Sequence, residues 1–166
     1  MKELESMYPQ DKEECYRLIL AQIEALMENE ENLIPNLGNV SALLNLALVD
    51  INWVGFYLMK NGELLLGPFQ GKPACIHIPV GKGVCGSAVA LDLTQLVFDV
   101  HQFPGHIACD SASRSEIVIP IHGNGKIVGV LDIDSPMIGR FDSKDQSGLE
   151  QVVKLIEQGC NWREFL

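Results

Sequence analysis

Hydrophobic residues recur at intervals of three and four positions near both ends of the chain, which is the spacing of a helix with one buried face. This pattern predicts a helix over residues 10–28, where Asp11 can cap the start, and a second helix over residues 35–49. A third helix is predicted after Asp142 and Asp145, which fit a capping arrangement. Its apolar face consists of Leu149, Val152, Val153 and Ile156.

Between these helices the apolar residues follow the pattern of strands. Residues 52–59 are rich in aromatic and branched side chains, and the hairpin-turn pair Asn61-Gly62 separates them from an apolar run at residues 63–69. Residues 115–122 and 127–134 flank a second turn that contains two glycines. The middle of the chain is therefore predicted to form two β-hairpins.

Three further segments complete the predicted elements. Residues 81–91 begin with glycines and continue as a short helix, residues 96–100 form a short strand, and residues 101–113 lack periodicity and form a loop. Helices around hairpin-linked strands are typical of an α+β fold with a mostly antiparallel sheet. Without an internal repeat, a length of 166 residues predicts a single domain over residues 1–166.

The composition narrows the classes of function. A net charge of −10 argues against nucleic-acid binding, which needs a basic surface, and against binding to an anionic membrane. The chain starts without the apolar segment of a signal peptide, and no apolar run approaches the roughly 18 residues of a membrane span. We therefore expect a cytoplasmic protein. Five cysteines, an odd number, do not suit the disulfide framework of a secreted protein.

Three of the cysteines, Cys75, Cys85 and Cys109, lie in glycine-rich or polar stretches that resemble loops. A thiolate is a nucleophile and a soft metal ligand, so several thiols in polar loops indicate redox chemistry or metal binding. For Cys109 the alternative is an incidental cysteine in a solvated loop. Structural zinc sites draw on closely spaced ligand pairs, whereas these cysteines are ten and twenty-four residues apart and only His101 and His106 are near Cys109. We therefore predict no metal.

Acidic residues end the second hairpin. Side chains alternate along a strand, so Asp132 and Asp134 project to one face while Leu131 and Ile133 project to the other. Two interpretations stay open: the strand runs out into solvent, or the two carboxyls form a site that binds a cation or shares a proton. Glu116 opens the neighbouring strand, and the hairpin would bring all three carboxyls together.

Aromatic residues mark the first predicted strand. Trp53, Gly55 and Tyr57 share one face, where the glycine between two aromatics is expected to leave open space above the sheet. Such a stripe forms either ordinary core packing or a small apolar pocket with polar tips.

Near Cys109, Arg114 or a cluster of backbone N–H groups could stabilise a thiolate.

Taken together, these motifs resemble a known family. The strings DINWVGFYL, LGPFQGKPACIHIPVGKGVCGSAVA, DVHQFPGHIACDSASRSEIVIPI and GVLDIDSP with GRFD are similar to those of the free methionine-(R)-sulfoxide reductases, which are GAF-domain enzymes. The resemblance covers about residues 41–149 and includes three family cysteines together. It implies a GAF-like α+β fold with a central antiparallel sheet of about six strands flanked by helices.

The resemblance also implies a role for each matching residue. Cys109 corresponds to the catalytic cysteine, Cys75 to the resolving cysteine, and Cys85 to a third cysteine with a supporting or alternative resolving role. The substrate-binding residues that it implies are Trp53, Tyr57, Glu116, Asp132 and Asp134. It implies free methionine-(R)-sulfoxide as substrate, a thioredoxin-type reductant, and neither cofactor nor metal. Cys15 and Cys160 are additional cysteines to which it assigns nothing.

Two other classes of function compete with this one. The chain could be a non-catalytic GAF sensor of a small molecule, which would need no thiols, or a cysteine-based redox switch or metal-binding regulator. A homodimer is also expected if the apolar faces of the terminal helices pair between two copies, although the same faces could instead cover the sheet.

Overall fold

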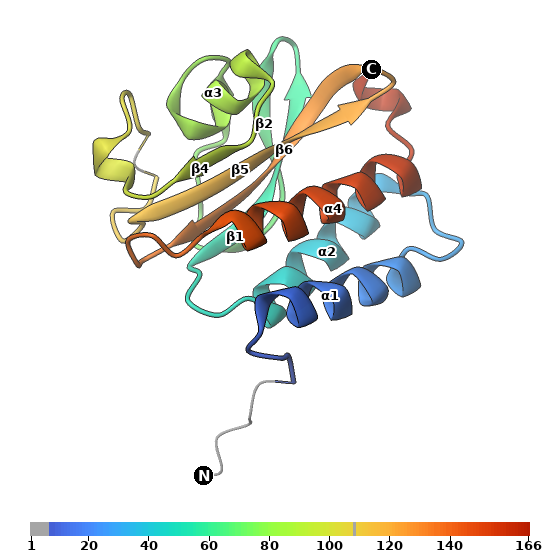
Figure 1. Cartoon of the computed structure of the whole chain (residues 1–166). Coiled ribbons are helices and arrows are strands. Elements are labelled where there is room, and N and C mark those ends of the chain that lie inside the picture. Colours follow the sequence, from blue (N-terminus) through green and yellow to red (C-terminus); the bar gives the residue numbers. More distant parts are fainter. Residues whose placement is uncertain (1–6, 108) are drawn as a thin grey trace.

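In the computed structural model, which describes residues 7–107 and 109–166, six strands form one antiparallel sheet in the order β3-β2-β1-β6-β5-β4. The helices are α1 (Lys12–Leu26), α2 (Leu33–Ala47), α3 (Gly83–Leu91) and α4 (Ser143–Gly159). The strands are β1 (Trp53–Lys60), β2 (Glu63–Gly71), β3 (His77–Pro79), β4 (Gln95–Val97), β5 (Ser115–Gly123) and β6 (Lys126–Ser135). Figure 1 shows α1, α2 and α4 on one face of the sheet and α3 with the long loops on the other.

The helix ends follow from local sequence. Asp11 accepts a hydrogen bond from the Glu14 backbone N–H, and Asp142 with Asp145 forms the predicted capping box of α4. Helix α2 begins at Leu33, two residues before the predicted start at Pro35. Proline is tolerated in the first turn because the N–H groups there have no partner within the helix.

One short strand was predicted with wrong bounds, and another was not predicted. The strand predicted over residues 96–100 is β4 (Gln95–Val97), and the chain then turns into the 3₁₀ helix η1 (Val100–Gln102), where Asp99 accepts from the His101 backbone N–H. Strand β3 was not predicted at all. It has three residues and exists only through its pairing with β2, so no local periodicity could indicate it.

The sheet separates two clusters of buried side chains. Phe56, Leu131 and Ile133 belong to the larger cluster, which fills the space between the sheet and α1, α2 and α4. The predicted apolar face of α4 lies in the same cluster. The terminal helices thus use their apolar faces to cover the sheet, so these faces give no support to a homodimer, which stays a prediction. The 3₁₀ helix η2 (Arg163–Phe165) follows α4.

The smaller cluster, on the other face, includes Trp53, Tyr57 and Cys85. Its polar neighbours are described in the next subsection. Among the described residues, no helix is both long enough and apolar enough to cross a membrane.

Candidate active site

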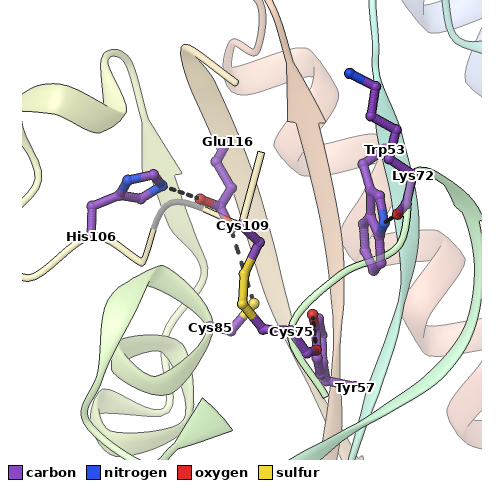
Figure 2. The surroundings of a disulfide bond; sticks show 8 residues. All are labelled: Trp53, Tyr57, Lys72, Cys75, Cys85, His106, Cys109 and Glu116. Carbon is purple, nitrogen blue, oxygen red and sulfur yellow. Dashed lines mark hydrogen bonds and ion pairs between the residues drawn. A yellow bond between two sulfur atoms is a disulfide. The ribbon is translucent and has the colours of Figure 1, made fainter. Parts of the chain in front are cut away.

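A disulfide joins Cys75 to Cys109 across 34 residues of sequence, with their Cα atoms 5.9 Å apart. Cys75 lies in the loop between β2 and β3, and Cys109 lies in the loop between η1 and β5. Figure 2 shows the bond beside Cys85 and Glu116. Cys75 is half-buried and Cys109 is exposed, so the bond lies where the pocket meets solvent. The structure therefore brings two of the three predicted cysteines into covalent contact.

The third cysteine, Cys85, is not in a loop. It is the third residue of α3, it is buried, and its Sγ lies 4.0 Å from Glu116 Oε1. Burial raises the pKa of the Cys85 thiol well above its usual value, and the nearby carboxyls of Asp132 and Glu116 raise it further. Cys85 therefore stays a neutral thiol at physiological pH.

The hairpin of β5 and β6 brings the three predicted carboxyls together. Glu116 pairs directly with Asp134 in the β5–β6 register, and Asp132 projects to the same face two residues earlier. All three line one pocket. Glu116 and Asp132 are buried and Asp134 is half-buried, so the interpretation of a strand running out into solvent is wrong.

Burial controls the protonation of these carboxyls. It is the largest cause that raises the pKa of Glu116, Asp132 and Asp134 well above the usual values, and each carboxyl also has a neighbouring acid that adds to the shift. A side-chain hydrogen bond with Glu116 further raises the pKa of Asp132. The group thus holds at least one proton near neutral pH. Asp132 Oδ1 is buried and has no hydrogen-bond partner among the described residues.

His106 lies beside the carboxyls without serving as their counter-charge. Its Nε2 is 3.7 Å from Glu116 Oε2 (Figure 2), yet burial lowers the pKa of His106. The imidazole is therefore neutral near pH 7, and its contact with Glu116 is not a strong ion pair.

The aromatic wall of the pocket is formed by Trp53 and Tyr57, and Phe69 stacks on Trp53. The ring centroids of Trp53 and Phe69 are 5.2 Å apart and those of Trp53 and Tyr57 are 5.9 Å apart. The prediction of open space above Gly55 was wrong, because a Cβ at that position would lie 2.3 Å from Phe69 Cβ. Glycine is needed there to let Phe69 approach the strand.

The polar tips of the two pocket aromatics hold the loop that carries Cys75. Trp53 Nε1 donates to the Lys72 carbonyl at 3.2 Å, and the Tyr57 hydroxyl donates to the Cys75 carbonyl at 2.9 Å. Figure 2 shows both side chains reaching toward this loop. The predicted substrate-binding aromatics are therefore also anchors of the disulfide loop.

The pocket is narrow, with an interior volume of about 40 Å³. One end is formed by the start of α3, where Lys82, Gly83 and Val84 line the wall. The first N–H groups of a helix have no partner within it and can bind an anion, and Lys82 makes no side-chain cap there. Glu116, Asp132 and Asp134 line the same pocket. Acidic groups and the positive end of the α3 helix dipole therefore lie within one pocket.

Sequence reasoning missed four residues near the disulfide. Asn52 Nδ2 donates to Asp110 Oδ2 and to Ser113 Oγ, both at 3.1 Å, and Lys72 Nζ lies 3.8 Å from Asp110 Oδ2. These residues lie far apart in sequence and have no periodic spacing, so only the fold shows their contacts.

One group of side chains has spacing that could accommodate a metal ion. Cys85 Sγ and one carboxylate oxygen each from Glu116 and Asp132 lie within 4.8 Å of one another. A zinc site built from all three central cysteines is not formed, because Cys75 and Cys109 are joined to each other.

The comparisons with known proteins agree with this geometry. The GAF domain profile matches residues 13–159. The free methionine-R-sulfoxide reductase of Escherichia coli is 53% identical over 148 residues, which are 89% of this chain and 90% of that protein. The reduced form of Staphylococcus aureus fRMsr is 59% identical with a TM-score of 0.85, over 87% of this chain and 94% of that one. The chain belongs to the GAF-domain family of free methionine-R-sulfoxide reductases.

Membership of this reductase family confirms the predicted fold class, an α+β GAF fold with a six-stranded antiparallel sheet. Protein YtsP of Bacillus subtilis is a further relative, 55% identical over 150 residues, which are 89% of this chain and 92% of that protein. The roles of individual residues within the reductase fold stay predictions, and they are argued from the geometry below.

Proposed function

We propose that the chain reduces free methionine-(R)-sulfoxide to methionine through a cysteine sulfenic acid and an intramolecular disulfide. The observation that carries this proposal is the Cys75–Cys109 bond at the pocket that Glu116, Asp132 and Asp134 line. A sulfoxide needs a thiolate to attack sulfur and an acid to protonate oxygen, and the pocket offers both. The E. coli relative and the substrate complex of the S. aureus structure support the choice of substrate.

In the first step, the Cys109 thiolate attacks the sulfoxide sulfur while a carboxyl protonates the oxygen. Attack forms a bond between Cys109 Sγ and the substrate sulfur; the protonated oxygen then passes to Cys109 Sγ as the S–O bond to the substrate and the new S–S bond break. Methionine leaves with the electron pair as a thioether, and Cys109 is left as a sulfenic acid. Asp132 is our candidate for the proton donor, since it is buried beside Glu116 and its Oδ1 has no other partner.

In the second step, the Cys75 thiol attacks the sulfenic acid sulfur of Cys109. A disulfide forms and water leaves. The protein still lacks the two electrons that it gave to the sulfoxide in the first step. A thioredoxin-type dithiol then reduces the bond by thiol exchange and becomes a disulfide itself. Exposure of Cys109 makes one sulfur of the bond accessible to such a partner. We also propose that the protein forms a homodimer and that it is cytoplasmic.

Recognition of a free amino acid follows from the charges at the two ends of the pocket. The carboxylates of Glu116 and Asp134 would bind the α-ammonium group while Asp132 keeps its proton for the sulfoxide oxygen, and the N–H groups at the start of α3 would bind the α-carboxylate. The methyl group on the sulfur would lie against Trp53 and Tyr57. A methionine sulfoxide residue within a peptide lacks both charges and would leave buried polar groups unpaired, which is costly.

The pocket of the disulfide form has a small interior. A cavity of about 40 Å³ holds only a few water molecules, since each needs roughly 10–15 Å³ of such volume. We therefore propose that the substrate binds to the thiol form, and that formation of the disulfide follows the release of methionine.

The negative pocket opposes formation of the Cys109 thiolate, so positive groups are needed nearby. Lys72 and Lys82 line the pocket, whereas Arg114, which the sequence suggested, is not among its lining residues. The N–H groups at the start of α3 add to the positive potential. Cys85, as a neutral buried thiol beside Glu116, has a supporting role in this scheme and does not resolve the sulfenic acid.

The direct test is an assay of purified protein with free methionine-(R)-sulfoxide and dithiothreitol, with methionine as the measured product. We expect Cys109→Ser to lower the rate to background and Cys75→Ser to accumulate a sulfenic acid that dimedone labels. Cys160→Ser, which removes a thiol outside the pocket, is the matched control and should retain full activity.

Three outcomes would contradict the proposal, the third only in part. A wild-type protein that binds the sulfoxide without turnover would indicate a GAF sensor. Full activity in Cys109→Ser would remove Cys109 as the nucleophile. Equal rates with the S epimer would contradict the stereochemical part of the proposal only.

A further inference from the structure

The side chain of Asn52 joins the turn that follows Cys109 to the sheet. Asn52 directly precedes β1, and its backbone N–H donates to the Asp134 carbonyl on β6 at 2.9 Å. Its Nδ2 donates to Asp110 Oδ2 and Ser113 Oγ, both at 3.1 Å. A residue that is fixed in the sheet therefore holds both ends of the turn over residues 110–113.

This turn also has hydrogen bonds of its own. Asp110 Oδ1 accepts from the Ala112 backbone N–H at 2.9 Å, and the Ser113 backbone N–H donates to the Asp110 carbonyl at 3.2 Å. An aspartate that bonds to the backbone two residues later makes a compact turn. Residues 110–113 therefore form one hydrogen-bonded turn, and the bonds from Asn52 join this turn, with Cys109 at its edge, to the sheet.

The second cysteine loop is held by the residue next to Asn52. Trp53 Nε1 donates to the Lys72 carbonyl, and Lys72 Nζ lies 3.8 Å from Asp110 Oδ2. The Lys72 side chain is 75% exposed, and ion pairs of this kind contribute little. The adjacent residues Asn52 and Trp53 thus each hold one of the two loops, in addition to the Tyr57 hydroxyl on the Cys75 carbonyl and the disulfide itself.

The charge of Asp110 determines the orientation of the Asn52 side-chain amide. The Asp110 carboxyl is ionised, because the hydrogen bond from the Ala112 backbone N–H, the bond from Asn52 and the charge of Lys72 lower its pKa. Only the NH₂ end of an amide can donate to a carboxylate, and a flipped amide would place two oxygens against each other. The orientation leaves Asn52 Oδ1 buried without a partner among the described residues.

We propose that Asn52 is a positioning residue for closure of the Cys75–Cys109 disulfide and takes no part in the attack on the sulfoxide. The assignment of steps rests on the proposed function. In closure, Cys75 Sγ attacks Cys109 Sγ, the S–O bond of the sulfenic acid breaks, and the hydroxyl leaves as water with the proton of Cys75. The rate of closure depends on the fraction of time that the two sulfurs spend within bonding distance. Asn52 raises this fraction by holding the Cys109 turn in place.

The first test needs no sulfoxide. Protein variants are equilibrated with reduced and oxidised glutathione, and the fraction of Cys75–Cys109 disulfide is measured by mass spectrometry after alkylation. Loss of two hydrogen bonds in Asn52→Ala should lower the equilibrium constant for closure about tenfold. Asn45→Ala makes the same chemical change at an exposed position of α2 and should match the wild type.

Asn52→Asp sharpens the test because it keeps the size of the side chain and replaces the donor by a charge that repels Asp110. It should lower the closure constant more than Asn52→Ala does. The double variant Asn52→Asp with Asp110→Asn restores a donor and an acceptor in exchanged positions and should recover much of the loss. A role in filling space alone would instead leave Asn52→Asp unchanged.

The second test separates the two chemical steps. In a single turnover without reductant, Asn52→Ala should form methionine within about threefold of the wild-type rate. The sulfenic acid on Cys109, trapped with dimedone, should persist about ten times longer. Closure constants equal to the wild type in both single variants, or an equal slowing of both steps, would overturn the proposal. A wild-type protein that forms no methionine would instead refute the proposed function, while the glutathione equilibrium would still test Asn52.

Discussion

Strand β6 presents Leu131 and Ile133 to one face of the sheet and Asp132 to the other. On the face covered by α1, α2 and α4, Leu131 and Ile133 are fully buried among apolar side chains. On the pocket face, Asp132 is 5% exposed, so it is buried almost as deeply. The two faces therefore differ in chemistry much more than in burial.

This difference shows how the fold distributes stability and function. Burial of an apolar side chain is favourable by roughly 25 cal/mol per Å² of area removed from water. Burial of a carboxyl is unfavourable unless the group is paired, and here it appears as raised pKa values of Glu116, Asp132 and Asp134. The helix face stabilises the fold, and the pocket face keeps an unfavourable arrangement of carboxyls whose pKa values are raised.

The largest effect should come from Asp132→Asn on the pocket face. If Asp132 protonates the sulfoxide oxygen, an amide of the same shape should lower kcat/KM by about 10²–10⁴. The measurement is methionine formation with dithiothreitol as reductant. Asp142→Asn makes the same chemical change on the helix side and should leave kcat/KM unaltered. A variant of Asp132 with wild-type kcat/KM would show that another carboxyl donates the proton.

A large effect on stability should come from Leu131→Ala on the helix face. Removal of this fully buried side chain leaves a cavity beside its strand neighbours Phe56 and Ile119, and should lower the free energy of unfolding by about 2–5 kcal/mol. Chemical denaturation measures the loss. Leu46→Ala, at a 68% exposed position of α2, should cost far less. Equal losses in the two variants would refute the contrast between core and surface.

The pH dependence of stability should distinguish the acids of the two faces. The raised pKa of Asp132 means that the folded protein binds this proton more tightly than the unfolded chain, whose aspartates titrate near 3.9. The contribution of Asp132 is therefore most favourable below about pH 4 and is lost as the pH rises toward the folded pKa. In the disulfide form, Asp132→Asn should be more stable than the wild type at pH 8, by about 1 kcal/mol or more, and close to it at pH 4. A difference that grows on acidification would contradict the burial argument.

The smallest effect, of opposite sign, is expected for Asp142 at the start of α4. Partial burial raises its pKa, but hydrogen bonds from Lys12 and from the Asp145 backbone N–H outweigh it and hold the pKa at about 2. The stability from this charge is present above about pH 4 and is lost as the pH falls through about 2. Because the side chain is 52% exposed, Asp142→Asn should cost only about 0.5 kcal/mol at pH 7. Chemical denaturation at pH 7 and pH 2 measures the difference in the free energy of unfolding between Asp142→Asn and the wild type. A difference of the same size at pH 2 would show that it does not arise from the charge of Asp142.

Much of the candidate site could be predicted from sequence because its parts are local. The turn between residues 122 and 127 begins the β5–β6 pairing, and an irregularity between Ile121 and His122 shifts the register by one residue, which places Glu116 opposite Asp134. The alternation of side chains along β6 then assigns Asp132 to the same face. The helix caps at Asp11 and Asp142 were equally readable, since each acts within three residues.

Other features depended on contacts between distant segments. The sequence placed Cys85 among loop thiols, yet α3 buries it against Glu116. It suggested open space at Gly55, which Phe69 of β2 fills. It gave no sign of Asn52, whose partners Asp110 and Ser113 lie more than fifty residues away. Each of these depends on which segments pack together, a property that no local pattern contains.

By itself, the sequence determined the helices, the two hairpins, the face that carries the acids and, through its motifs, the family, because each of these follows from neighbouring residues or short strings. Only the tertiary structure decided that Cys75 meets Cys109, that the interior of the pocket in the disulfide form is small, and that burial raises the pKa values of the acids. The physical reason is that distance and solvation are set by all the segments that surround a side chain. A carboxyl in β6 has the same chemistry in any strand, and its pKa changes only when β5, β1 and α3 exclude water from it.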